Sequence, residues 1–208
     1  MHIYIFGSIV RGELDEFSDV DLILISDEHL EKIDSSKYSI YTTSRIKELF
    51  SEGNPFAWHL YYESVLVFGK EYDLLKTIGP PQKYTNCKND LIKFKNLFDQ
   101  SIASIKENNL SIVFDLAMIF LAIRNFATCY SLDKYKKPIF SRNSFEKLPD
   151  HPLTLDSEIK SLLMTARMSS TRGVNIEINE ELINKMFNEL DLIVNWFDKI
   201  LNEYENRI

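Results

Sequence analysis

The 208-residue sequence is poor in cysteine, glycine and proline, with two, six and six of them. The two cysteines, Cys87 and Cys129, stand in unrelated contexts and give neither a disulfide framework nor a zinc-site spacing. The first residues lack a basic stretch followed by an apolar run and a cleavage site, so we expect no secretory signal peptide. These features together predict a cytoplasmic protein.

Long hydrophobic runs and clusters of basic residues are also scarce. The most apolar segment, 110–123, contains Asp115 and is shorter than the roughly 20 residues that a membrane span needs, so it predicts a buried helix and no membrane partner. The chain carries 24 basic and 31 acidic residues, a formal net charge of −7. Nucleic-acid binders neutralise phosphates with clustered Lys and Arg, so this balance argues against nucleic acid as a principal partner.

The first 80 residues carry the pattern of a small sheet. Runs of β-branched and aromatic residues bounded by turn residues predict four strands, at 2–6, 20–25, 38–43 and 64–68. Ser44 is a candidate N-cap for a short helix through Phe50. The triplet Gly79-Pro80-Pro81 is the strongest break in the sequence, and it divides a domain at 1–80 from one at 81–208.

The second part has helical periodicity throughout. Apolar residues at three- and four-residue spacing predict amphipathic helices over 91–105, 156–168 and 179–204, the last capped by Asn179. The segment 110–130 is apolar on nearly all sides, as in the central helix of a bundle. The expected fold class is therefore α+β: a small mixed β-sheet with flanking helices, followed by an all-α helical bundle of roughly four helices.

One stretch, 6–22, carries residues suited to phosphate chemistry. A strand ends at the turn Gly7-Ser8, and a later strand opens with Asp19-Val20-Asp21. Residues two apart in a strand face the same side, so both carboxylates project together and can bind one or two hard cations. The backbone N–H groups of a Gly-Ser turn can bind phosphate oxygens beside those cations. The pattern predicts a metal and nucleotide site.

The spacing G-S-x10-D-x-D, with Arg11-Gly12 and Ser18 between its ends, resembles the DNA polymerase β-like nucleotidyltransferase superfamily. It is most similar to the minimal nucleotidyltransferases and to the aminoglycoside (kanamycin-type) nucleotidyltransferases. Members of both groups join a small catalytic sheet domain to a helical bundle, of the HEPN type in some minimal nucleotidyltransferases. The segment 54–69, NPFAWHLYYESVLVFG, is similar to the end of the catalytic domain in such proteins.

The resemblance implies a reaction and a set of residues. An acceptor hydroxyl would attack the α-phosphorus of a nucleoside triphosphate, ATP by preference, and pyrophosphate would leave with the help of Mg²⁺. Asp19 and Asp21 would be the catalytic carboxylates and the metal ligands. The nucleotide would be bound by four further residues: Gly7, Ser8, Arg11 and Ser18.

The sequence departs from the superfamily pattern at one acidic position. Active members usually supply a third carboxylate from a later strand, as metal ligand or general base, whereas this chain has Ser39 there. Some aminoglycoside-type enzymes take their base from the helical domain, where Asp115 and Glu146 are candidates. We favour the alternative that Asp115 pairs with a Lys or Arg of the bundle or reaches the surface.

Three functional hypotheses remain open on the sequence alone. The first is transfer of AMP to a hydroxyl of a small molecule, for which the acidic composition suits a cationic acceptor. The second is transfer to a protein side chain, as in antitoxins that modify a HEPN-type partner. The third is a degenerate module that binds nucleotides without catalysis.

A HEPN-type ribonuclease is excluded because no histidine follows Arg124 at the required spacing. His59 is interpreted as a packing residue. The first strand begins almost at Met1, which leaves a sheet edge that another subunit of a homodimer could cover.

Overall fold

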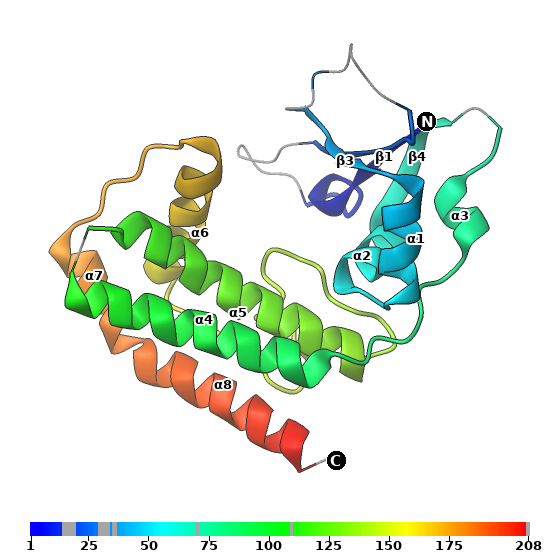
Figure 1. Cartoon of the computed structure of the whole chain (residues 1–208). Coiled ribbons are helices and arrows are strands. Elements are labelled where there is room, and N and C mark those ends of the chain that lie inside the picture. The colour runs from blue at the N-terminus through cyan, green and yellow to red at the C-terminus, as the bar shows by residue number, and fades with distance from the viewer. Residues whose placement is uncertain (14–19, 29–33, 35–36, 70, 109, 207–208) are drawn as a thin grey trace. The chain divides into compact units, whose positions relative to one another are not determined.

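The computed structural model describes residues 1–13, 20–28, 34, 37–69, 71–108 and 110–206. The chain folds into two compact units, Met1–Thr85 and Asn86–Ile208. The first unit is a mixed sheet with helices, and the second is helical (Figure 1). The predicted α+β fold class is therefore confirmed.

A four-stranded sheet in the order β3-β2-β1-β4 forms the centre of the first unit. Its strands are β1 (His2–Phe6), β2 (Asp21–Ile25), β3 (Ser39–Tyr41) and β4 (Ser64–Gly69). β1 pairs antiparallel with β2 and with β4, whereas β2 and β3 pair in parallel. The strands predicted at 20–25 and 38–43 are thus shorter than their sequence patterns suggested.

Helices pack on one face of this sheet because its side chains alternate. In β1, the side chains of His2, Tyr4 and Phe6 are buried and the two isoleucines between them are half-buried. Tyr4 and Phe6 share one core with residues of β2 and of three helices. These helices are α1 (Thr43–Ser51), α2 (Pro55–Glu63) and α3 (Leu74–Ile78). Asp21 lies at the end of the strand face that contributes to this core, since side chains two apart in β2 face the same side.

The helix caps differ in two ways from the sequence prediction. α1 is capped by Thr42, whose side chain accepts a hydrogen bond from the Arg45 N–H at 3.2 Å, and the predicted cap Ser44 lies inside the helix. The motif Gly53-Asn54-Pro55 ends α1 and also begins α2, which the sequence did not predict. Asn54 accepts a hydrogen bond from the Phe56 N–H at 2.9 Å, and a proline in the first turn suits a helix start.

A buried tyrosine ties the sheet to α3. The Tyr4 hydroxyl donates to Asp73 Oδ1 at 2.9 Å and accepts from the Leu75 N–H at 3.0 Å. Burial raises the pKa of Tyr4 well above its ordinary value of 10.0, and the adjacent Asp73 carboxylate raises it further. Burial alone would raise the pKa of Asp73 as well, but the hydrogen bonds that it accepts from Tyr4 and Lys76 lower it overall. The neutral phenol and the ionised carboxylate therefore belong to the folded state.

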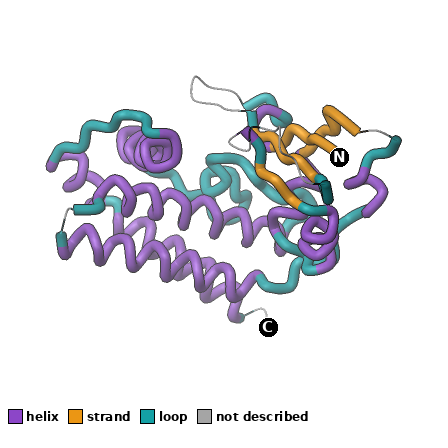
Figure 2. The backbone as a smooth tube through the Cα atoms, turned by 45° about the horizontal axis from the view of Figure 1, so that its top comes forward, coloured by secondary structure: helices purple, strands orange, loops and turns teal. Residues whose placement is uncertain are grey.

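The second unit is built from five described helices. They are α4 (Cys87–Glu107), α5 (Ile112–Lys134), α6 (Ser157–Arg172), α7 (Glu180–Asn188) and α8 (Leu190–Glu205). α4 and α5 pack along their lengths, and α5 also packs against α6 (Figure 2). The helix predicted at 179–204 begins as expected at its Asn179 cap but breaks at Glu189 into α7 and α8.

The central helix α5 is longer than the sequence suggested. It extends over 23 residues, and by length and composition alone it is apolar enough to cross a membrane. Of its most apolar window, 56% is buried inside the protein, and its neighbours are the amphipathic helices α4 and α6. The core helix of a bundle has these same properties, so the apolar composition is weak support for a membrane span.

Candidate active site

The turn that follows β1 is compact and closed by its own backbone. The residues Gly7–Ile9 form a short 3-10 helix, η1, in which Gly7 is buried and Ser8 is half-buried. The N–H groups of Val10 and Arg11 donate to the Gly7 carbonyl at 3.2 and 3.4 Å, and that of Glu13 donates to the Ser8 carbonyl at 3.0 Å. The turn is therefore held in one shape from Gly7 to Glu13.

Gly7 is required at this place for two reasons. Its φ of +78° lies in the left-handed region, which residues with a side chain rarely adopt. A Cβ atom on Gly7 would lie 2.8 Å from Asp21 Oδ2, closer than real Cβ contacts. The strand register explains this proximity, because Phe6, the residue before Gly7, pairs with Asp21. The structure thus brings the predicted turn and the second predicted carboxylate into direct contact.

Two of the predicted site residues, Ser18 and Asp19, lie outside the described residues. Their roles remain predictions from the sequence. The spacing of Asp19 and Asp21 is the only basis for placing both carboxylates on one side of the strand.

Arg11, the predicted phosphate contact, is engaged by two carboxylates. Its Nε donates to Glu13 Oε2 at 2.8 Å, and its Nη1 forms an ion pair with Glu63 Oε2. The side chains of Arg11 and Glu63 are 17% and 15% exposed, so this pair is better shielded from water than a surface salt bridge. A guanidinium has five N–H donors, and these two contacts leave others for a phosphate.

Glu63 and His59 are site residues that the sequence analysis did not find. His59 Nε2 lies 2.9 Å from Glu63 Oε2, the oxygen that also pairs with Arg11, and its ring packs edge-on against Phe6 at 5.7 Å between centroids. His59 does pack, as predicted, but it also joins the ionic cluster. The two residues are four apart on α2, a spacing that places them on one helix face. That signal was present in the sequence but needed the prediction of α2.

Ser39, the residue at the predicted position of a third carboxylate, lies in the strand next to β2. Ser39 pairs with Ile23 in the parallel β2–β3 ladder, and Ile23 is two residues beyond Asp21 on the same face. Ser39 is exposed at the start of β3. Within the described residues no group of three His, Cys, Asp or Glu side chains is arranged to hold a metal ion.

The sequence matches the family model of the nucleotidyltransferase domain over residues 2–108. The chain belongs to this family. The match covers the sheet, the Gly7 turn, Asp21, and α2 with its Glu63, and it extends through α4. No curated protein matches the chain. The DNA polymerase β-like domain that the motif suggested is thereby confirmed, and it is followed by a helical C-terminal region.

The two candidate bases of the C-terminal region, Asp115 and Glu146, each bind a neighbour in that region. Asp115, at the start of α5, is buried and accepts hydrogen bonds from the hydroxyls of Ser104 and Ser111 at 2.9 and 2.7 Å. The expectation that Asp115 pairs with a Lys or Arg or reaches the surface is wrong, because this carboxylate is buried and its hydrogen-bond donors are serine hydroxyls. Glu146, the other candidate base, pairs with Lys160 of α6 at 2.8 Å.

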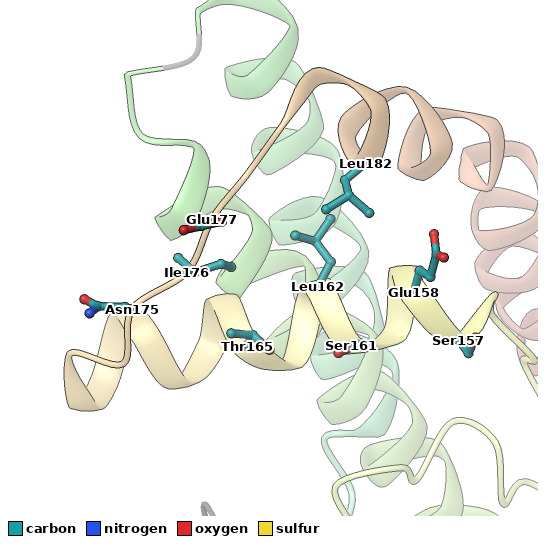
Figure 3. A pocket seen from close by; sticks show the side chains of 9 residues that line it. All are labelled: Ser157, Glu158, Ser161, Leu162, Thr165, Asn175, Ile176, Glu177 and Leu182. Atoms are coloured by element: carbon teal, nitrogen blue, oxygen red, sulfur yellow. The ribbon is translucent and has the colours of Figure 1, made fainter.

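A pocket of about 410 Å³ lies in the helical unit, between α6 and the segment that leads into α7 (Figure 3). It is lined by Ser157, Glu158, Ser161, Leu162, Thr165, Asn175, Ile176, Glu177 and Leu182. No residue of the Gly7 turn or of β2 lines it. Its lining residues lie outside the 2–108 match and include none of the candidate site residues on β1 and β2.

Proposed function

We propose that the chain transfers a nucleoside monophosphate, AMP from ATP in the presence of Mg²⁺, to a hydroxyl group of an acceptor. The observation that carries this proposal is the contact of the buried Gly7 turn with the Asp21 carboxylate, within a domain of the nucleotidyltransferase family. A glycine turn beside a carboxylate suits a triphosphate and the cation that accompanies it.

The residues present fit a magnesium ion on one side. Asp21 is half-buried, and its carboxylate lies so close to Gly7 that a Cβ at that position would be 2.8 Å from Oδ2. We propose Asp19 as the second carboxylate ligand. When bound, a magnesium ion would supply positive charge to stabilise the negative charge that develops during transfer. The Gly7 turn would orient the triphosphate against it, with Ser8, Arg11 and Ser18 as further contacts.

We propose a small molecule as the acceptor. The net charge of −7 supports an acceptor with positive charge, because an acidic protein attracts cationic substrates. A hydroxyl of a protein side chain is the alternative acceptor in the same chemistry. The two differ in a simple observation, the gain of one nucleotide mass on a co-purifying protein.

A second candidate function is a module that binds nucleotides without transferring them. Ser39 favours it, because this position on the Asp21 face lacks the carboxylate that could hold a second cation or accept a proton. Such a module would still need the Gly7 turn but would depend less on Asp21.

The test uses the purified full-length chain with Mg²⁺ and each of the four nucleoside triphosphates. Binding is measured by calorimetry with non-hydrolysable analogues, and transfer by pyrophosphate release with a panel of hydroxyl acceptors, aminoglycosides included. We expect preferred binding of the ATP analogue, pyrophosphate release, and loss of both by at least tenfold in Asp21→Asn. Binding without release, unchanged in Asp21→Asn, would favour the binding module, and the absence of any binding would refute both functions.

The matched control for this test is Glu48→Gln. Glu48 pairs with Arg45 on the exposed side of α1, in the same unit but outside the site. Glu48→Gln removes one carboxylate charge from the unit, as Asp21→Asn does. We expect wild-type binding and turnover from this variant, so that any loss in Asp21→Asn is assigned to the position of the carboxylate rather than to the charge of the unit.

A further inference from the structure

Glu63 lies on the opposite side of the Gly7 turn from Asp21. The last residue of β1, Phe6, pairs with Asp21 in β2 and with Ser64 in β4. The turn begins at the next residue, and Glu63 immediately precedes Ser64, so the turn leaves the sheet between two acidic residues. Asp21 contacts the turn through Gly7, whereas Glu63 contacts it through the side chain of Arg11.

The Glu63 carboxylate is fixed from several directions. Glu63 is the last residue of α2. The hydroxyl of the next residue, Ser64, donates to the Leu60 carbonyl at 2.6 Å. The single oxygen Oε2 contacts both Arg11 and His59, and the ring of His59 packs against Phe6. Each side chain of this cluster is mostly buried, with 14% exposure at His59. A carboxylate held in this way has little freedom to turn toward another partner.

Arg11 links the fixed Glu63 carboxylate to the turn. Its backbone N–H donates to the Gly7 carbonyl, and its side chain joins Glu13 of the same turn to Glu63 of α2. The turn is therefore braced internally by backbone hydrogen bonds and externally by one guanidinium. Charge-assisted contacts of a planar guanidinium fix direction as well as distance.

We propose that Glu63 is a positioning residue for the nucleotide: through Arg11 it holds the Gly7–Glu13 turn against α2 in the shape that receives the triphosphate. This inference rests on the proposed function, since it concerns the same nucleotide site. Glu63 does not touch the nucleotide. When the turn is already ordered before binding, no entropy is lost in ordering it as the nucleotide binds. The contact of Glu63 with Arg11 therefore strengthens binding.

The opposite role is the physical competitor. Glu63 and Glu13 place two negative charges on Arg11, and a triphosphate would have to compete with them for the guanidinium. If competition dominated, removal of the Glu63 charge would tighten nucleotide binding. The two roles thus predict opposite signs for the same substitution.

The experiment measures binding of a non-hydrolysable ATP analogue with Mg²⁺ to the full-length chain by calorimetry. The variants are Glu63→Gln, Arg11→Gln and the double variant, with Glu48→Gln as the control that removes an exposed Arg–Glu pair from the same unit. We expect Kd to rise about tenfold in Glu63→Gln, which is about 1.4 kcal/mol, and to stay at the wild-type value in the control. In the double variant we expect no further loss beyond Arg11→Gln, because Glu63 acts through Arg11.

Steady-state kinetics separates positioning from general loss of structure. Removal of a residue that contributes only to binding raises KM and leaves kcat unchanged. We expect this split in Glu63→Gln, with a far-UV circular dichroism spectrum like that of the wild type. Should Glu63→Gln fail to fold, Arg11→Lys replaces it: the charge is kept but the planar fork is lost, and a several-fold rise in Kd is expected.

The outcomes distinguish the two proposals. Wild-type protein that does not bind the analogue refutes the proposed function and this inference with it. Wild-type protein that binds, together with equal or tighter binding by Glu63→Gln or unchanged binding by Arg11→Lys, overturns only the role of Glu63. A double variant that binds much more weakly than Arg11→Gln would also overturn it, since Glu63 would then act without Arg11.

Discussion

The substitution of Gly7 by alanine tests the geometry of the site most directly, because the turn contains its own control. Gly7 and Gly12 both have positive φ, +78° and +69°. A Cβ on Gly7 would lie 2.8 Å from Asp21 Oδ2, whereas a Cβ on Gly12 would meet nothing within 4 Å. Both variants therefore carry the same backbone strain, and only Gly7→Ala also disturbs the carboxylate.

The magnitudes follow from these two contributions. Placing a non-glycine residue in the left-handed region costs about 1–2 kcal/mol. For a chain of this size, each kcal/mol lowers Tm by about 2–4 °C. The contact with Asp21 involves the end of a side chain, which can rotate away, so we expect little additional loss of stability. Rotation moves the carboxylate from the place where the cation is proposed to bind.

The expected result is a difference in binding between two variants of similar stability. Thermal unfolding should give Gly7→Ala and Gly12→Ala Tm values within a few degrees of each other. Calorimetry with Mg²⁺ and the ATP analogue should show at least a tenfold rise in Kd for Gly7→Ala, about 1.4 kcal/mol, and less than half of that free energy for Gly12→Ala. Equal losses of affinity in the two variants would refute the reasoning, because the proximity of Asp21 would then have no consequence.

Three further predictions concern the same unit. Gly53→Ala should cost clearly more stability than Gly79→Ala in chemical denaturation: both have positive φ, but a Cβ on Gly53 would lie 2.5 Å from backbone carbonyl oxygens, and one on Gly79 would meet nothing. Tyr4 has a raised pKa, so its contribution to stability is complete below pH 10.0 and is lost as the pH rises through its folded-state pKa; Tyr4→Phe should flatten this alkaline decline in a pH series of unfolding free energies. Tyr4→Phe also removes one of the donors to Asp73 and the acceptor of the Leu75 N–H, so it should cost about 1–3 kcal/mol at neutral pH. Ser39→Asp should lower the Kd for Mg²⁺ in calorimetry, because it adds a carboxylate to the Asp21 face, and unchanged Mg²⁺ affinity would count against that placement.

The strands of the sheet and most helices of the bundle were predictable because their patterns are local. A run such as that of 2–6 identifies a strand through its β-branched and aromatic residues alone. The break between α7 and α8 was not predictable from periodicity. Glu189 joins them in a right-handed helical conformation, with φ −87° and ψ −7°, so the apolar stripe continues across the break. Such a joint changes direction without changing the hydrophobic pattern.

α2 was missed because its signals point in two directions. Gly53-Asn54-Pro55 is typical of a helix end, and here it also caps the next helix. The residues that follow are mostly apolar and aromatic, and the polar face formed by His59 and Glu63 is too narrow to mark a surface helix. Because α2 was not predicted, the position of Glu63 was not predicted either. Glu63 pairs with Arg11, which is 52 residues away in the sequence. The motif predicts the residues that we propose to bind the nucleotide, whereas Glu63, which pairs with Arg11 of that motif, could be identified only from the fold.

The two acidic residues beside the turn therefore divide the work of the site. Asp21 lies close to Gly7, where we propose that the cation binds, whereas Glu63 pairs with the guanidinium of Arg11. A third carboxylate at position 39 would belong with Asp21, since it would share that face of the sheet; Glu63 cannot replace it while paired with Arg11 and His59. We therefore expect nucleotide binding to depend on both sides of the turn, and kcat to depend on the Asp21 side. A variant that weakens binding without slowing kcat points to Glu63, and one that slows kcat points to β2.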